Sequence, residues 1–193
     1  MYRSCKTESA ARRQRALESG FMELLCKRQY DDITVSQLCQ HLQIPRRVFY
    51  RYFSGKDGAL YALIDHTIND FYVLPHGGEK QAGTALGDLD LFFHFWHGRK
   101  PLLDALQRSG KSGILVERVN DFALREGMMP RQFKDMPDQV KEIAMAFVLC
   151  GLMSMILQWH RTGFALSPKE MSRLATAMLT KPLLQTPPAG AER

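Results

Sequence analysis

The chain has 193 residues, of which 26 are Lys or Arg and 20 are Asp or Glu, and its formal net charge is +6. This length allows one or two globular domains with a real core, and strand-like alternation is scarce, so the sequence predicts an all-α protein. The N-terminal segment has no apolar stretch, which excludes a secretory signal there. The four cysteines, at positions 5, 26, 39 and 150, lack metal-binding or disulfide spacing, which favours free thiols in a reducing cytoplasm. Cys26 and Cys39 lie on apolar faces and are expected to be buried.

After an arm of about nine residues, a helix is expected from about Ala10 to Lys27. Its apolar residues recur at helical spacing, at Leu17, Phe21, Leu24 and Leu25. Three basic residues stand at its start, and each either reaches a DNA phosphate or solvates the helix end. These residues are Arg12, Arg13 and Arg15.

The stretch from Thr34 to Phe53 predicts two short helices joined by a tight turn. Thr34 and Gln37 have the spacing of a capping box, and Pro45 suits the first turn of the second helix. The apolar residues of both helices fall on packing faces, namely Val35, Leu38, Cys39 and Leu42, then Val48, Phe49, Tyr52 and Phe53. Such a pair with a basic outer face is typical of a helix-turn-helix.

The positive charge of the chain is concentrated beside this motif. Residues 1–56 hold 11 Lys and Arg against 5 Asp and Glu, whereas residues 57–193 hold 15 of each. This asymmetry favours a polyanionic partner, and arginine side chains suit guanine edges and phosphates. Two alternatives are a basic face that only solubilises the helix and a membrane surface, but residues 1–56 have no long apolar face beyond what a small core needs.

Several motifs in this region resemble the DNA-binding domain of TetR-family transcriptional regulators. They are Thr34-Val35, the run Phe49-Tyr50-Arg51-Tyr52-Phe53, and Lys56-Asp57, and the resemblance covers about residues 10–65. Gln43 replaces the usual turn glycine, so an altered backbone is expected there. Together, the resemblance and the helix faces predict a DNA-binding set of Thr34, Pro45, Arg46, Arg47, Val48, Tyr50, Arg51, Tyr52 and Lys56.

A longer helix is expected from about Lys56 to Leu74, with Ser54 as its cap and Asp57 in the capping-box position. In the family, this helix links the DNA-binding domain to the ligand domain. The loop that follows runs from Pro75 to Gly83. Further helices are expected at 84–97, 101–109, 112–126, 138–162 and from Ser167-Pro168, and Gly127 is a predicted C-cap.

Aromatic side chains in this second part predict either an apolar ligand cavity or an ordinary core. The predicted ligand-binding residues are Phe92, Phe93, Trp96, Phe122, Phe147 and Trp159, with His94, Arg118 and Gln158 as polar groups of the pocket. His94 and His97 share one helical turn, but two ligands do not make a zinc site, so no metal and no cofactor are expected.

The segment from Ile143 to Leu157 is apolar almost all round but shorter than a bilayer-spanning helix, so no membrane contact is expected. Trp159, Thr162-Gly163-Phe164 and Ser167-Pro168 are similar to the C-terminal end of many TetR-like proteins. There the last two helices form a four-helix bundle with a second subunit. The resemblance therefore implies a homodimer, while burial within one subunit is the alternative.

The sequence predicts a cytoplasmic, non-enzymatic regulator. Its expected parts are a DNA-binding domain (residues 1–56), a helical regulatory and dimerisation domain (57–182) and a disordered tail (183–193). The expected function is a dimeric repressor that a small-molecule effector releases from a double-stranded DNA operator. The alternatives are a ligand-independent DNA-binding protein and, less favoured, a metal-binding helical enzyme that uses His94 and His97.

Overall fold

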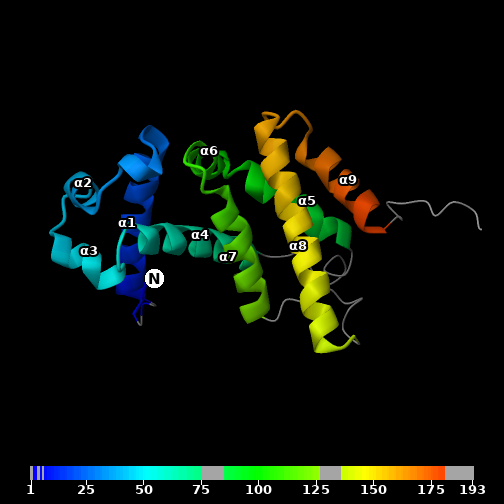
Figure 1. Ribbon diagram of the computed structural model, residues 1–193, viewed down its shortest axis with the longest axis horizontal. Coiled ribbons are helices and arrows are strands. Elements are labelled where there is room, and N and C mark those ends of the chain that lie inside the picture. Colours follow the sequence, from blue (N-terminus) through cyan, green and yellow to red (C-terminus); the bar gives the residue numbers. More distant parts are fainter. Residues whose placement is uncertain (1, 4, 6, 75–84, 127–135, 181–193) are drawn as a thin grey trace, which may run out of the picture.

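The computed structural model describes residues 2–3, 5, 7–74, 85–126 and 136–180, without the side chains of residues 85–88. The regular secondary structure of these residues is helical, with one isolated bridge between Tyr2 and Phe53 and no strand, which confirms the predicted all-α fold (Figure 1). The helices are α1 (Glu8–Lys27), α2 (Val35–His41), α3 (Arg46–Tyr52), α4 (Lys56–Tyr72), α5 (Ala85–His97), α6 (Lys100–Arg108), α7 (Ser112–Arg125), α8 (Asp138–Arg161) and α9 (Pro168–Thr180), with the 3₁₀ turn η1 (Tyr30–Asp32) after α1.

The helices α1, α2 and α3 form the N-terminal part of the molecule. Because α2 and α3 have only seven residues each, they depend on packing for stability. Their shared core contains the buried side chains of Phe21, Leu25, Leu38 and Phe49. Gly20 allows the end of α2 to approach α1 closely, since a Cβ atom there would lie 2.1 Å from Cδ2 of Leu42.

The start of α2 has the capping box that the sequence predicts. Thr34 Oγ1 accepts a hydrogen bond from the Gln37 backbone N–H at 3.2 Å, and Gln37 Oε1 accepts one from the Thr34 N–H at 2.9 Å. The predicted cap of α4 is wrong. Gly55, not Ser54, is its N-cap, and no side chain caps it. The Asp57 carboxylate instead accepts a hydrogen bond from the hydroxyl of Tyr30.

The turn between α2 and α3 closes through backbone hydrogen bonds. The Gln43 N–H donates to the Gln40 carbonyl at 3.1 Å, and the Ile44 N–H donates to the Cys39 carbonyl at 2.9 Å. This is a Schellman motif, which places its central residue in the left-handed region. Gln43 takes φ 52° there, a conformation that glycine adopts more easily.

Helix α4 connects the two parts of the molecule, lying between α1 and α7 (Figure 1). Its middle is buried almost all round, including Leu60, Ile64 and Ile68. The expected division at residues 56 and 57 cuts the first turn of this helix, so α4 belongs to both parts. Polar pairs hold it to its neighbours: Arg15 with Asp70 (2.6 Å) and Glu18 with His66 (2.9 Å) on α1, and Arg118 with Asp65 (2.7 Å) on α7.

The C-terminal part is a bundle in which α5 packs along α9 and α7 packs along α8. Phe93 of α5 meets Trp159 of α8 edge to face, with ring centroids 5.8 Å apart, and Phe164 also meets Trp159 edge to face at 4.6 Å. At the start of α9, Ser167 and Glu170 form the predicted capping box. Predicted features at Pro75–Gly83, Gly127 and the tail from residue 183 lie outside the described residues.

Helices α8 and α9 expose apolar side chains on their outer faces. Ile143 is 72% exposed and Phe147 is 71% exposed, and Leu174 and Met178 of α9 are also exposed. Within the described residues, α8 alone is long and apolar enough to cross a membrane, and 22% of its most apolar window is buried. Its opposite face, with Met153 and Ile156, is fully buried in the bundle.

Candidate DNA-binding face and ligand cavity

The outer face of α3 carries the basic residues of the predicted DNA-binding set. Arg46, Arg47, Tyr50 and Arg51 are exposed, while Phe49 between them is completely buried. The buried ring fixes the rotation of the helix, so the neighbouring charged side chains must point outward. A short helix with such a face fits the major groove of DNA.

Three other residues of the predicted set lie at the edges of this face. Thr34 is exposed at the start of α2, and Pro45 is the exposed N-cap of α3, one position before the helix begins. Val48 is half-buried. In addition, the Arg46 guanidinium donates a hydrogen bond to the Ser36 hydroxyl, which positions it above α2.

Two residues of the predicted set are occupied within the protein. Tyr52 is buried in the core beside Phe53. Lys56 donates to the Tyr30 carbonyl at 2.8 Å, and its ammonium lies 4.2 Å from the centre of the Tyr30 ring. These positions separate Tyr52 and Lys56 from the exposed side chains of α3, and whether either contacts DNA stays a prediction.

Tyr30 joins the two parts of the molecule through polar contacts. Burial, and then the hydrogen bond to Asp57, raises the pKa of its hydroxyl, which therefore remains a donor. Its backbone N–H donates to the Ser109 hydroxyl at 2.9 Å, and Lys111 lies 5.2 Å from its ring centre. The α6–α7 turn is thereby attached to the end of the DNA-binding part.

The basic residues at the start of α1 have different environments. Arg12 pairs with Glu8 at 2.7 Å on the open surface, and Arg13 is exposed. Arg15 instead holds Asp70 of α4, which makes it a structural side chain.

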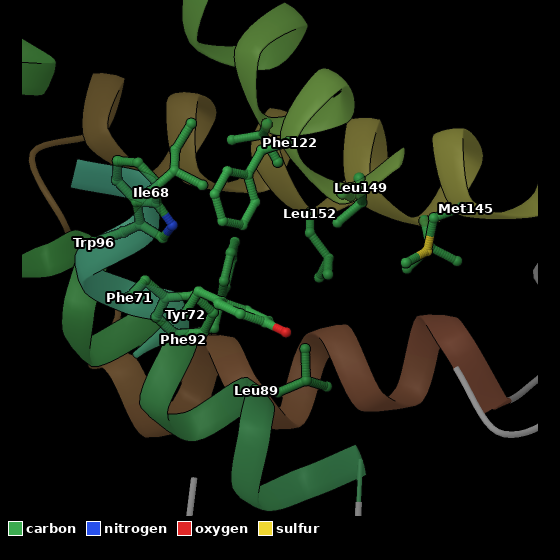
Figure 2. Close-up of a pocket in the computed structure, with 13 residues that line it drawn as sticks. Ile68, Phe71, Tyr72, Leu89, Phe92, Trp96, Phe122, Met145, Leu149 and Leu152 are labelled. Carbon is green, nitrogen blue, oxygen red and sulfur yellow. The ribbon is translucent and has the colours of Figure 1, made fainter. Parts of the chain in front are cut away.

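Helices α4, α5, α7 and α8 line an apolar cavity of about 240 Å³ (Figure 2). Each helix contributes neighbouring turns to the wall, so the lining repeats the i, i+3, i+4 spacing of one helix face. The lining residues are Ile68, Phe71 and Tyr72 of α4, Leu89, Phe92 and Trp96 of α5, Val119, Phe122 and Ala123 of α7, and Met145, Val148, Leu149 and Leu152 of α8.

The predicted ligand-binding residues divide into two groups. Phe92, Trp96 and Phe122 line the cavity. Phe93 and Trp159 pack against each other in the core outside it, and Phe147 points into solvent. Whether any of the six contacts a ligand stays a prediction.

The polar groups expected in the pocket lie elsewhere. Arg118 binds Asp65, and His94 Nδ1 bonds to the Asp90 carbonyl of its own helix at 2.8 Å. Gln158 is exposed on α8. Apart from the Tyr72 hydroxyl, the lining therefore consists of apolar side chains and the indole ring of Trp96.

Sequence reasoning missed the α4 part of the cavity, although a signal was present. Ile68, Phe71 and Tyr72 have the i, i+3, i+4 spacing of one face at the end of the linking helix. The spacing could not tell whether this face met solvent, core or cavity, because that depends on how α5 and α7 pack.

Metal-binding and cysteine chemistry are weakly represented in the described part of the chain. No group of three or more metal-ligating side chains occurs there. His97 packs against the rings of Trp159 and Phe164, at 5.5 and 4.8 Å between ring centroids. All four cysteines are free thiols, and Cys39 is buried as expected, but the prediction that Cys26 is buried is wrong because it lies at the exposed end of α1.

Comparison with known proteins places these features in a family context. Residues 117–181 match the TetR-type family model described as a transcriptional regulator C-terminal region. None of the curated proteins matches this sequence.

Solved structures share the fold at low sequence identity. A TetR-family transcriptional regulator from Streptomyces coelicolor is 22% identical, with a TM-score of 0.57 over 86% of this chain and 78% of that one. The fatty acid degradation regulator FadR from Bacillus halodurans is 13% identical, with a TM-score of 0.61 over 93% and 98%. The TetR family repressor AlkX from Dietzia sp., implicated in biodegradation of n-alkanes, is 17% identical, with a TM-score of 0.52 over 86% and 92%.

Proposed function

Because the chain belongs to the TetR family of transcriptional regulators, which bind DNA and are not enzymes, we infer that it is a dimeric cytoplasmic repressor released from its operator by a neutral, apolar small molecule. The observation that carries this proposal is the position of the cavity. Its wall includes the end of α4, the helix whose other end follows the DNA-reading helix.

The charge distribution supports DNA as the partner. The exposed arginines of α3 gather on one face, and the excess positive charge of the chain lies within residues 1–56. Phosphate contacts provide affinity that falls steeply with salt, whereas arginine contacts with guanine edges provide sequence selectivity. We expect Arg47 and Arg51 to contribute both to affinity and to sequence selectivity.

The cavity wall defines the chemistry of the effector. A charged group inside it would lose its hydration, and the lining has no charged side chain to compensate, only the Tyr72 hydroxyl and the Trp96 indole, so its entry is strongly unfavourable. A neutral hydrocarbon chain, a long-chain alcohol or a small aromatic compound fits this environment. FadR and AlkX, whose names refer to fatty acid degradation and n-alkanes, lend support to an aliphatic effector.

The exposed apolar faces of α8 and α9 support a homodimer. A second copy related by a two-fold axis would bring the same faces together and cover Ile143, Phe147, Leu174 and Met178. A membrane is the less favourable cover, because inserting α8 would strip Met153 and Ile156 from their buried positions in the bundle.

The switch works by differential binding. A ligand that fills the cavity contacts Ile68, Phe71 and Tyr72 and favours one placement of the end of α4 over another. Because α4 also packs on α1, its displacement moves the DNA-binding part and changes the separation of the two reading helices in the dimer. A coupling free energy of about 1–3 kcal/mol corresponds to about a 5–150-fold change in operator affinity.

The test begins with an operator selected from random duplex DNA by the purified full-length protein. Alkanes, alcohols and small aromatics are then ranked by the rise in melting temperature, and operator affinity is measured with and without the best compound. The proposal expects a near-palindromic operator and weaker binding with the compound. A bound compound that leaves operator affinity unchanged would indicate a ligand-independent regulator. A compound that raises operator affinity would show that the effector strengthens DNA binding instead of releasing the protein.

A further inference from the structure

The first described residues of the chain are attached to the end of the DNA-reading helix. Tyr2 forms an antiparallel bridge with Phe53, and the Arg3 backbone N–H donates to the Tyr52 carbonyl at 2.9 Å. Tyr52 is the last residue of α3, and Phe53 follows it. The pair Tyr2 and Arg3, here termed the N-terminal strap, therefore follows any movement of the end of α3.

The side chain of Tyr2 contacts a different helix, α4. The Tyr2 hydroxyl donates to Asp65 Oδ2 on α4 at 2.7 Å, and its ring meets His66 edge to face at 5.6 Å. Burial, and then the hydrogen bond to Asp65, raises the pKa of Tyr2 above its ordinary value. The hydroxyl consequently stays protonated and able to donate throughout the physiological pH range.

Asp65 also holds the helix that lines the ligand cavity. Its carboxylate is 3% exposed and accepts from Arg118 Nε of α7 at 2.7 Å and from a second nitrogen of the same guanidinium. The residue that follows Arg118, Val119, lines the cavity, as does Phe122 one turn later. A single buried carboxylate thus accepts hydrogen bonds from the strap and from the cavity helix.

We propose that Tyr2 is a positioning residue that couples α7 to the end of the reading helix through Asp65. A shift of α7 moves the Arg118 guanidinium, and the Asp65 carboxylate follows this charged partner because their interaction is the stronger one. The Asp65 oxygen then leaves the position in which it accepts the hydrogen bond from the Tyr2 hydroxyl. The strap then loosens and the end of α3 is held less firmly. The use of this path by an effector rests on the proposed function, but the coupling exists without DNA or effector.

The coupling is measured by amide hydrogen exchange on the full-length protein, followed at the amides of Arg3 and Phe53. Tyr2→Phe removes only the hydroxyl, and Arg118→Lys removes the two-nitrogen grip on Asp65. Each change should speed exchange at both amides about 3–10-fold, the effect of one lost hydrogen bond, and the double variant should be no faster than either single.

A matched control lies in the same arm. Cys5→Ala removes the hydrogen bond from Cys5 Sγ to Gln14 Oε1, which connects the arm to α1 only, and should leave Phe53 exchange unchanged. The proposal is overturned if Arg118→Lys leaves exchange at Arg3 and Phe53 at the wild-type rate, or if the two effects multiply in the double variant. Should Arg118→Lys fail to fold, Asp65→Asn, which keeps an acceptor but no charge, replaces it.

A second experiment tests whether the strap takes part in regulation. With the neutral fluorescent amine N-phenyl-1-naphthylamine as the cavity probe, operator affinity is compared for wild type, Tyr2→Phe and Cys5→Ala. A probe effect that is several-fold smaller in Tyr2→Phe alone supports the coupling, and an equal effect in all three overturns its regulatory use. If the probe leaves the wild-type affinity unchanged, the proposed effector response is contradicted, while the exchange experiment still decides the coupling.

Discussion

The DNA-facing surface and the ligand cavity use opposite chemistry. The exposed face of α3 presents Arg46, Arg47 and Arg51, whereas the cavity wall presents hydrocarbon and aromatic side chains. Charges on a surface act over a distance set by ionic strength, while an apolar cavity selects by shape and desolvation. DNA binding should therefore depend steeply on salt and effector binding should not, which allows the two functions to be measured separately.

The outer faces of α8 and α9 have the chemistry of the cavity rather than that of α3. Ile143 and Phe147 are the most exposed large apolar side chains among the described residues of α8. If these faces form the dimer interface, apolar contact decides how two charged reading helices are spaced. Variants that exchange charged and apolar character on these surfaces test whether this division holds.

The largest effect is expected from a charge in the apolar face. Phe147→Glu should give monomers, because a carboxylate cannot be buried unpaired in the interface. Losing the second reading helix should then lower operator affinity by about two to three orders of magnitude. Sedimentation velocity and fluorescence anisotropy with labelled operator measure the two effects.

Leu124→Glu is the matched control for this variant. Leu124 is 54% exposed on α7, which is not one of the two helices of the proposed interface, so its charged variant should remain dimeric. A dimeric Phe147→Glu protein would contradict the assigned interface.

A smaller effect is expected on the charged side of the comparison. Arg47→Ala should cost about 1–3 kcal/mol of operator binding and relax selectivity at one base pair. The logarithm of affinity should also fall less steeply with the logarithm of salt concentration. Lys100→Ala on α6 removes an exposed charge outside both α3 and the proposed dimer interface and should change neither quantity. Wild-type affinity in Arg46→Ala and Arg47→Ala alike would show that α3 is not the reading helix.

The cavity can be tested by filling it. Ala123 lines the cavity and Ala105 lies in packed core, and both are 1% exposed. Ala105→Leu should destabilise the protein by about 1–3 kcal/mol through overpacking. Ala123→Leu has space for its added carbons and should lose far less, while blocking the effector. Urea unfolding of both variants gives the comparison. Equal losses in the free energy of unfolding would mean that the cavity is collapsed in solution.

The local features of the DNA-binding part could be predicted because they depend on neighbours in sequence. The capping box of Thr34 and Gln37 and the buried position of Phe49 follow from spacing alone. Lys56 shows the limit of this reasoning. Its contact with the Tyr30 carbonyl comes from 26 residues away, and no local pattern indicates that its ammonium is already bound.

The cavity could be predicted only in part, because its shape depends on four helices meeting. Aromatic content identified Phe92, Trp96 and Phe122, but it could not separate them from Phe93, which lies one residue further along α5 and packs against Trp159. Phe147 was misplaced for a related reason. In a helix that is apolar all round, periodicity does not show which face meets the core.

The smallest effect is expected at the turn that sets α3 against α2. Gln43 and Gly163 occupy equivalent positions in two Schellman motifs, with φ of 52° and 70°. A side chain in this left-handed conformation is strained, whereas glycine is not, although glycine also gains entropy in the unfolded chain. Gln43→Gly should therefore raise the free energy of unfolding by about 0.5–1 kcal/mol, and Gly163→Ala should lower it by a similar amount. Urea unfolding measures the change in the free energy of unfolding of both variants.

Because Gln43→Gly leaves the hydrogen bonds of the turn intact, operator affinity should stay at the wild-type value. A loss of stability in Gln43→Gly would show that the glutamine side chain makes contacts that outweigh the strain of its backbone.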